Sequence, residues 1–225
     1  ASMGGNYLYF TAGVFVFLGS VFDAMDGAVA RALHVESPIG LQLDSLADGI
    51  SYGIAPGIIA YLAFFSKLPE IAFGINYGML LATIFPICAI YRLARFNVET
   101  DERKGFLGLP SPAAGVFIAS LPAVLTKSEL PFIGAVQIHL PIELVAILYI
   151  VIALLMVSKI DYNKVFSDIY KKSKVFTIAV VFILWMLFVI LKMHVVFIIA
   201  GGYIFMGILN AIVKVFKKKS NAVAF

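Results

Sequence analysis

Four aspartates lie within otherwise apolar sequence and carry most of the chemical information in this chain. Asp23 and Asp26 are three residues apart, and Asp44 and Asp48 are four apart, so each pair lies on one face of a helix. A carboxylate at the centre of a membrane helix costs roughly 2.5 to 3.5 kcal/mol, so four of them need compensating charge. An all-oxygen set selects hard divalent ions such as Mg²⁺, Mn²⁺ or Ca²⁺, and two ions about 3.5 to 4 Å apart would form a clamp for phosphoryl chemistry.

Two other roles are compatible with these carboxylates. They could pair with basic side chains to hold helices together, for which Arg31 is the basic residue near them in the sequence. They could also mark a proton or cation pathway, as ionisable residues inside membranes often do. A transporter would normally place them nearer the midplane and repeat the pattern in the second half of the chain. The later apolar stretches carry no comparable acidic pairs, so we favour the metal site.

The aspartates belong to a chain whose composition suits lipid. Of its 225 residues, 62% are hydrophobic and 13% are charged, whereas soluble domains are about 45 to 50% apolar and about 25% charged. About 20 apolar residues are needed to cross a bilayer, and lipid offers the backbone no hydrogen-bond partners, so each crossing must be a helix. We predict an all-α, polytopic membrane protein with one domain over 1–225, a catalytic core at about 8–158 and accessory helices at about 174–215. Seven stretches qualify as spans, at roughly 8–30, 41–66, 76–96, 109–126, 138–158, 174–192 and 194–215.

The basic residues predict how this bundle is oriented. Fourteen of the seventeen lysines and arginines follow the first, third, fifth or seventh stretch, and the positive-inside rule makes those loops cytoplasmic. Residue 1 then lies on the opposite side, and both aspartate pairs lie near the cytoplasmic ends of adjacent antiparallel helices. Because such an N-terminus has no room for a signal peptide, we expect an eighth helix before residue 1. The net charge of +4 is a topology signal rather than a nucleic-acid surface.

The run from Asp23 to Asp48, DAMDGAVARALHVESPIGLQLDSLAD, resembles the signature of the CDP-alcohol phosphotransferase family. That signature reads Asp, two residues, Asp-Gly, two residues, Ala-Arg, eight residues, Gly, three residues, Asp, three residues, Asp. Its eight fixed positions are filled by Asp23, Asp26, Gly27, Ala30, Arg31, Gly40, Asp44 and Asp48. A second stretch, YRLARFNVET and FLGLPSPAAG within Tyr91 to Gly115, resembles the phosphatidylserine synthase branch.

The resemblance implies a reaction, cofactors and a location. Members let an alcohol attack a CDP-linked lipid so that CMP leaves, and this branch uses L-serine and CDP-diacylglycerol to form phosphatidylserine. Glycerol 3-phosphate, inositol phosphate and choline are alternative acceptors within the family. The resemblance implies two Mg²⁺ or Mn²⁺ ions on Asp23, Asp26 and Asp44, with Asp48 either a ligand only or also the base that takes the alcohol's proton. It also implies a homodimer whose site lies at the cytoplasmic face, in the inner membrane if the source is bacterial.

The resemblance also implies which residues contact the CDP-lipid. These are Gly27, Ala30, Arg31, Ser37 and Gly40. Small side chains let a nucleotide approach the helix backbone, although they are equally suited to helix packing. Arg31 could bind the CDP phosphates or be a topology charge, and Ser37 could contact the nucleotide or cap the helix that begins near Gly40.

The acceptor pocket is implied by the second stretch. Arg92, Arg95 and Asn97 are its candidate residues, because arginine binds a carboxylate with two parallel hydrogen bonds. Without the resemblance, the two arginines would more often be topology charges. We expect the loop at 103–112 to close over the site. Separately, Gly49, Gly53 and Gly57 recur every four residues, which predicts the close approach of another helix.

Overall fold

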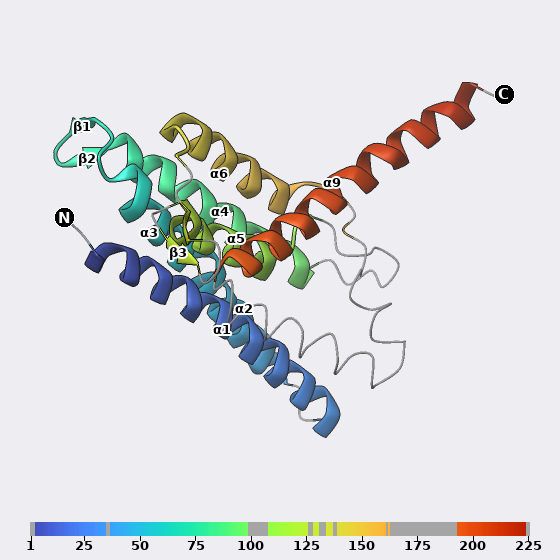
Figure 1. Cartoon of the computed structure of the whole chain (residues 1–225). Coiled ribbons are helices and arrows are strands. Elements are labelled where there is room, and N and C mark those ends of the chain that lie inside the picture. The colour runs from blue at the N-terminus through green and yellow to red at the C-terminus, as the bar shows by residue number, and fades with distance from the viewer. Residues whose placement is uncertain are drawn as a thin grey trace.

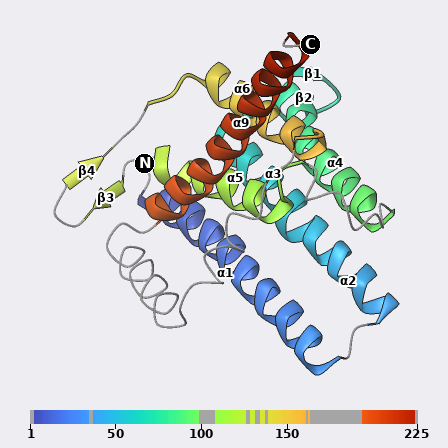
Figure 2. The same cartoon turned by 90° about the vertical axis from the view of Figure 1, so that its right-hand side faces the viewer.

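Helices dominate the computed structural model of the chain (Figure 1). The structure describes residues 3–34, 37–98, 108–125, 128–130, 134–136, 139–160, 162 and 193–223. The first helix, α1 (Met3–Leu33), is 31 residues long. It ends at a tight reversal in which His34 has a φ of 55°, and the chain then returns alongside it (Figure 2).

The returning helix begins with a clear start signal. Ser37 adopts an extended conformation and accepts a hydrogen bond from the Gly40 N–H, and Pro38 occupies the first turn, where a missing N–H costs nothing. The helix then runs from Pro38 to Phe65. It comprises α2 (Pro38–Asp48), a π-helical turn η1 (Gly49–Ile54), α3 (Ala55–Ala60) and a second π-helical turn η2 (Tyr61–Phe65).

The remaining elements alternate short hairpins with helices. A hairpin of β1 (Glu70–Ala72) and β2 (Ile75–Asn76) joins η2 to α4 (Tyr77–Val98). After α5 (Ser111–Leu125), β3 (Ser128–Leu130) and β4 (Gly134–Val136) form a second antiparallel hairpin. The last helices described are α6 (Ile142–Val157) and α9 (Met193–Val223). The sequence predicted only helices, so neither hairpin was expected.

The centre of the bundle is α5. Its residues from Ala114 to Val124 are all buried, and it packs against α1, α3, α9 and η1. On the other side α4 packs against α6 and against the π-helical turns. The glycine prediction is confirmed, because a Cβ atom at Gly53 or Gly57 would lie within 3.0 to 3.2 Å of atoms of α4.

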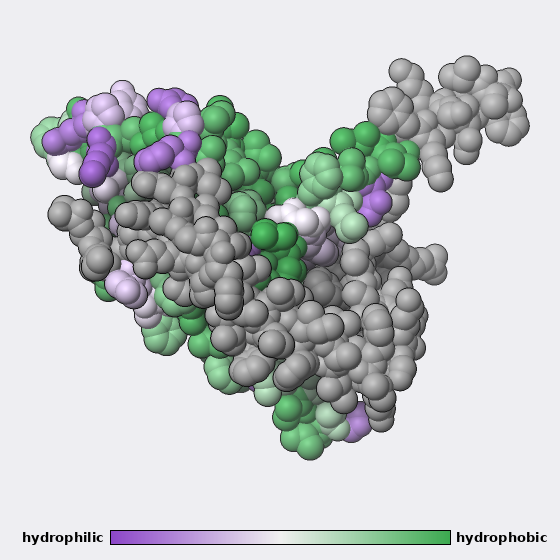
Figure 3. Space-filling view, viewed as in Figure 1, coloured by the Kyte–Doolittle hydropathy of each residue, from purple (hydrophilic) through white to green (hydrophobic). Residues whose placement is uncertain are grey.

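Four helices are long and apolar enough to cross a membrane: Tyr7–Ala30, Pro38–Phe65, Tyr77–Val98 and Met193–Val213. They correspond to four of the seven expected spans. The stretches expected at 109–126 and 138–158 form α5 and α6, which at 15 and 16 residues are shorter apolar helices. The span expected at 174–192 lies outside the described residues, so the structure supports a helical membrane protein but does not confirm a count of seven. In Figure 3 hydrophobic surface covers much of the described bundle, and hydrophilic residues gather at the end that bears β1 and β2.

Candidate functional site

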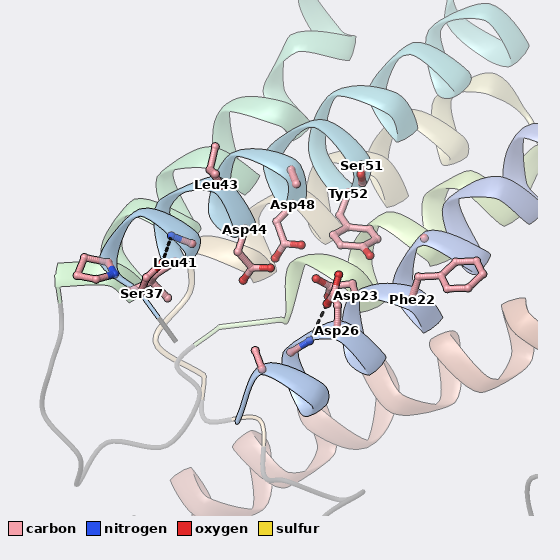
Figure 4. A pocket seen from close by; sticks show the side chains of 16 residues that line it. Phe22, Asp23, Asp26, Ser37, Leu41, Leu43, Asp44, Asp48, Ser51 and Tyr52 are labelled. Carbon is pink, nitrogen blue, oxygen red and sulfur yellow. Dashed lines mark hydrogen bonds between the residues drawn. The ribbon is translucent and has the colours of Figure 1, made fainter. Parts of the chain in front are cut away.

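A pocket of about 1040 Å³ opens between α1 and the helix that returns beside it (Figure 4). One wall comes from α1, and the other comes from Ser37 and from residues of α2 and η1. The lining includes seven of the eight signature residues and Ser37: Asp23, Asp26, Gly27, Ala30, Ser37, Gly40, Asp44 and Asp48. The eighth, Arg31, lies near the end of α1, and its side chain is outside the described part of the structure.

The four aspartates face this pocket from both walls. Asp23 and Asp48 are half-buried, whereas Asp26 and Asp44 are exposed. The carboxyl groups of Asp23 and Asp44 lie close enough across the pocket to repel each other. The N–H of Gly27 donates to Asp26 Oδ1 over 2.7 Å. The spacing of the two pairs therefore places four acidic groups around one space, as the sequence predicts.

Negative charge is in excess among the described residues of the pocket. Asp23, Asp26 and Asp44 each repel the charge of Asp48, and no basic side chain is among the described lining residues. Arg92 lies close enough to attract Asp48 from outside the pocket lining. Among the described residues, one guanidinium faces four carboxylates, and this excess of negative charge favours a bound cation.

The donor types suit a hard divalent ion, because such ions prefer carboxylate oxygen. Within the described residues, however, no three His, Cys, Asp or Glu side chains are grouped closely enough to enclose a metal. An ion would therefore require the carboxylates of α1 and α2 to draw together around it.

Ser37 and Gly40 act together at the start of α2. Ser37 Oγ accepts from the Gly40 N–H over 3.0 Å, and a Cβ at residue 40 would lie 3.0 Å from that oxygen. The capping role that the sequence allowed for Ser37 is therefore present. Since Ser37 also lines the pocket, its hydroxyl hydrogen is available to a ligand there.

The three candidate acceptor residues have different surroundings. Arg92 is 6% exposed, and its NH1 donates to Ser111 Oγ over 3.0 Å. Its buried Nε has no hydrogen-bond partner among the residues that the structure describes. Arg95 instead donates to the backbone carbonyls of Val157 and Ser158 at the end of α6.

Asn97 ties the end of α4 to α2. Its Nδ2 donates to Ser45 Oγ over 2.9 Å. None of the three acceptor candidates is among the described lining residues of the pocket. Arg92 is the candidate that combines an unpartnered donor with proximity to Asp48.

The loop expected to close over the site is described only from Gly108 onward. The Gly108 N–H donates to the Ile160 carbonyl and the Leu109 N–H to the Leu155 carbonyl. This part of the loop therefore docks on the end of α6. Residues 103–107 lie outside the described part of the chain.

Sequence reasoning missed Tyr52, which lines the pocket from η1. Tyr52 is 1% exposed, and its hydroxyl would lie 3.9 Å from a Cβ atom placed at Gly19 on α1. Its ring therefore reaches across to the opposite wall (Figure 4). The available signal was its position four residues after Asp48, which puts both on one helix face.

Comparison with known proteins shows which family this sequence resembles. The sequence profile described as CDP-alcohol phosphatidyltransferase matches residues 2–156. Relatives named CDP-diacylglycerol–serine O-phosphatidyltransferase include one from Methanocaldococcus jannaschii, 35% identical over 70% of this chain and 68% of the relative. One from Helicobacter pylori is 32% identical over 79% of this chain and 70% of the relative. One from Bacillus subtilis is 38% identical over 49% of this chain, and the match spans 59% of that relative's length.

Proposed function

The chain belongs to the CDP-alcohol phosphatidyltransferase family, and from this membership we propose that it transfers a phosphatidyl group from CDP-diacylglycerol to L-serine, releasing CMP and forming phosphatidylserine. The observation that carries the proposal is the convergence of all four signature aspartates on one pocket between two antiparallel helices. The names of the three relatives support serine as the acceptor.

The reaction replaces the phosphoanhydride bond of CDP-diacylglycerol with a phosphoester bond to serine. The serine hydroxyl oxygen attacks the phosphorus next to the diacylglycerol, and the bond from that phosphorus to the oxygen of CMP breaks. The serine proton must leave as the new bond forms. Asp48 suits this task, because it is a half-buried carboxylate at the inner end of the acidic group and close to Arg92.

Asp23, Asp26, Asp44 and Asp48 would hold two divalent ions, Mg²⁺ or Mn²⁺. When bound, these ions would supply the positive charge that stabilises the leaving CMP. The aspartates' own contribution is to come from two different helices, so that an ion between them also fixes the distance across the pocket.

The two ends of the pocket would receive different parts of the substrates. Gly27, Ala30, Ser37 and Gly40 lie where α1 ends and α2 begins, and we assign the CDP moiety to that end, with Arg31 beside it. Arg92 would bind the serine carboxylate, because its buried Nε lacks a hydrogen-bond partner in the described part of the chain and an ionised acceptor can satisfy it.

We also propose the arrangement in the cell. The protein is an integral membrane protein, and the excess of basic residues in alternate loops supports a site at the cytoplasmic face. A homodimer is proposed from the family resemblance.

The direct test is to purify the protein and measure CMP release from CDP-diacylglycerol with Mn²⁺ or Mg²⁺ and a panel of alcohols. We expect release with L-serine and formation of phosphatidylserine. Release with glycerol 3-phosphate alone would contradict the serine assignment. An absence of CMP with every alcohol would contradict the proposed enzyme class.

A further inference from the structure

The hairpin between η2 and α4 presents an unusual tip. Phe73 and Gly74 form its turn, with φ angles of 53° and 77°. Glycine adopts such angles freely, but a phenylalanine there is unfavourable. Phe73 is also 100% exposed, with Ile71 and Ile75 beside it at 45% and 46%. Phe73 therefore combines an unfavourable backbone conformation with a fully exposed aromatic ring. We expect such a ring to contact a partner outside the chain.

The base of this hairpin is fixed, so the tip has a defined position. Asn76 is 9% exposed, and its Nδ2 donates to the Tyr61 hydroxyl and to the Ser66 carbonyl, each over 3.2 Å. Its Oδ1 accepts from the Met79 N–H over 2.8 Å. At the tip, the Gly74 N–H donates to the Glu70 carboxylate. The hairpin is therefore held to the ends of both helices that it joins.

The position of the β1–β2 hairpin relative to the bilayer can be estimated from the lengths of the two helices that it joins. Fifteen residues of α4 separate Tyr77 from Arg92, about 22 Å at 1.5 Å per residue. Seventeen residues separate Asp48 from Phe65 on the preceding helix, which would span about 25 Å as regular α-helix and less through its two π-helical turns. The hydrocarbon core of a bilayer is about 30 Å thick. With the Arg92 and Asp48 layer near one boundary, the start of α4 at the base of the hairpin lies within about 8 Å of the other boundary, and the tip projects beyond that base (Figure 1).

The surroundings of the tip agree with such a boundary. Figure 3 shows hydrophilic and hydrophobic residues intermixed at this end of the molecule. Lys67 and Glu70 are exposed there, next to the exposed aromatic Tyr77. Mixed basic and aromatic side chains are typical of the membrane interface.

We propose that Phe73, flanked by Ile71 and Ile75, inserts into the lipid interface of the leaflet opposite the aspartate pocket. The hairpin then sets how deep the Pro38–Phe65 helix and α4 sit, because its base is bonded to both. Lipid is the occupant that fits, since the hairpin joins two membrane-length helices and the apolar tip emerges among polar residues. This inference does not depend on the proposed reaction.

The test uses tryptophan fluorescence in bilayers. Trp185 is the only tryptophan in the sequence, so Trp185→Phe gives a silent background for Phe73→Trp. The protein is reconstituted in phosphatidylcholine vesicles that carry bromine either near the headgroup or near the chain end. We expect stronger quenching by the shallow bromines than by the deep ones. Ile87→Trp, at an exposed position in the middle of α4, is the matched control and should show the opposite order.

Three outcomes would overturn the proposal. Quenching by aqueous iodide without quenching by brominated lipid would place the tip in water. Blue-shifted emission that neither quencher reduces would place it against protein, such as a second copy of this chain. Stronger quenching by deep than by shallow bromines would place it in the bilayer interior.

A second variant covers the case in which the tryptophan disturbs the turn. Cys88 is the only cysteine, so Phe73→Cys in a Cys88→Ala background carries a single thiol. A membrane-impermeant maleimide should label it much more slowly in vesicles than in unfolded protein. Equal labelling rates would contradict insertion.

Discussion

At the scale of single residues, Asp48 differs from the other three aspartates in what surrounds it. It is half-buried, it lies within electrostatic reach of Arg92, and Tyr52 lies one turn further along the same helix. The sequence predicts that the four carboxylates converge, because helical spacing fixes which residues share a face. It could not predict which is most enclosed, because that depends on how deeply α4 and α5 pack behind α2 and η1.

The role of Asp48 can be tested with Asp48→Asn. The amide keeps the shape of the side chain but cannot accept the serine proton, so CMP release should fall at least about 100-fold. Binding of CDP-diacylglycerol, measured by calorimetry, should persist. Glu143→Gln, an exposed carboxylate at the start of α6, is the control and should keep full activity. Wild-type turnover in Asp48→Asn would remove Asp48 from the chemistry.

Arg92 and Arg95 can be separated by the same conservative change. Arg92→Lys removes the unpartnered Nε donor, and the loss of a charged hydrogen bond should raise the KM for serine roughly 10- to 100-fold. Arg95→Lys should leave that KM unchanged, because Arg95 contacts the backbone at the end of α6. The measurement is steady-state CMP release at varied serine concentration. Equal effects of the two substitutions on KM would show that Arg92 has no special contact with serine.

At the scale of elements, predictions from sequence succeeded where an apolar pattern was long. The helices Tyr7–Ala30, Pro38–Phe65, Tyr77–Val98 and Met193–Val213 match expected spans because lipid permits little else. The β1–β2 hairpin was missed because its strands have only three and two residues. Phe73 is moreover not a typical turn residue, so apolar sequence concealed the turn. The docking of Gly108 on α6 was missed because it depends on contacts between residues distant in sequence.

The docked segment at Gly108 gives a prediction about stability. Gly108 has a φ of 80°, and a Cβ atom there would overlap the Met156 carbonyl oxygen. Gly108→Ala should therefore lower the free energy of unfolding by about 2 kcal/mol or more. Gly202→Ala on α9 is the matched control, because a Cβ at that position meets no atom of the described residues within 4 Å. Thermal unfolding in detergent should show a lower Tm for the first variant only; equal Tm values would contradict the docking.

At the scale of the whole molecule, the acidic pocket stands out because charged residues are scarce in the rest of the chain. Only 13% of the residues are charged, yet four carboxylates face one pocket between two helices. Their mutual repulsion opposes the approach of α1 and α2 on the two sides of the pocket unless a cation is bound. The amino-acid composition alone predicts the lipid environment. The Asp23–Asp48 signature predicts which residues line the pocket. The relative placement of α5, α6 and α9 behind it required the structure.

The repulsion predicts that metal removal affects stability as well as activity. Treatment with EDTA should abolish CMP release and lower the Tm in detergent, and Mn²⁺ should restore both. Asp23→Asn removes one repelling charge, so this variant should have a higher Tm than the wild type in EDTA and a smaller gain from Mn²⁺. Differential scanning fluorimetry measures both shifts. A Tm that is insensitive to EDTA and Mn²⁺ would argue against an ion that bridges the two helices.

The two π-helical turns in the Pro38–Phe65 helix have a consequence for how this helix tolerates insertions and deletions. A π turn arises when one extra residue is accommodated within an α-helix. Deleting one residue from Gly49–Ile54 would therefore let this segment close as regular α-helix and leave the orientation of the residues beyond it nearly unchanged. A deletion within the regular α-helix Ala55–Ala60 would instead rotate everything beyond it by about 100° and turn Tyr61 away from Asn76. The π-helical turns are therefore the places at which this helix tolerates the loss of one residue.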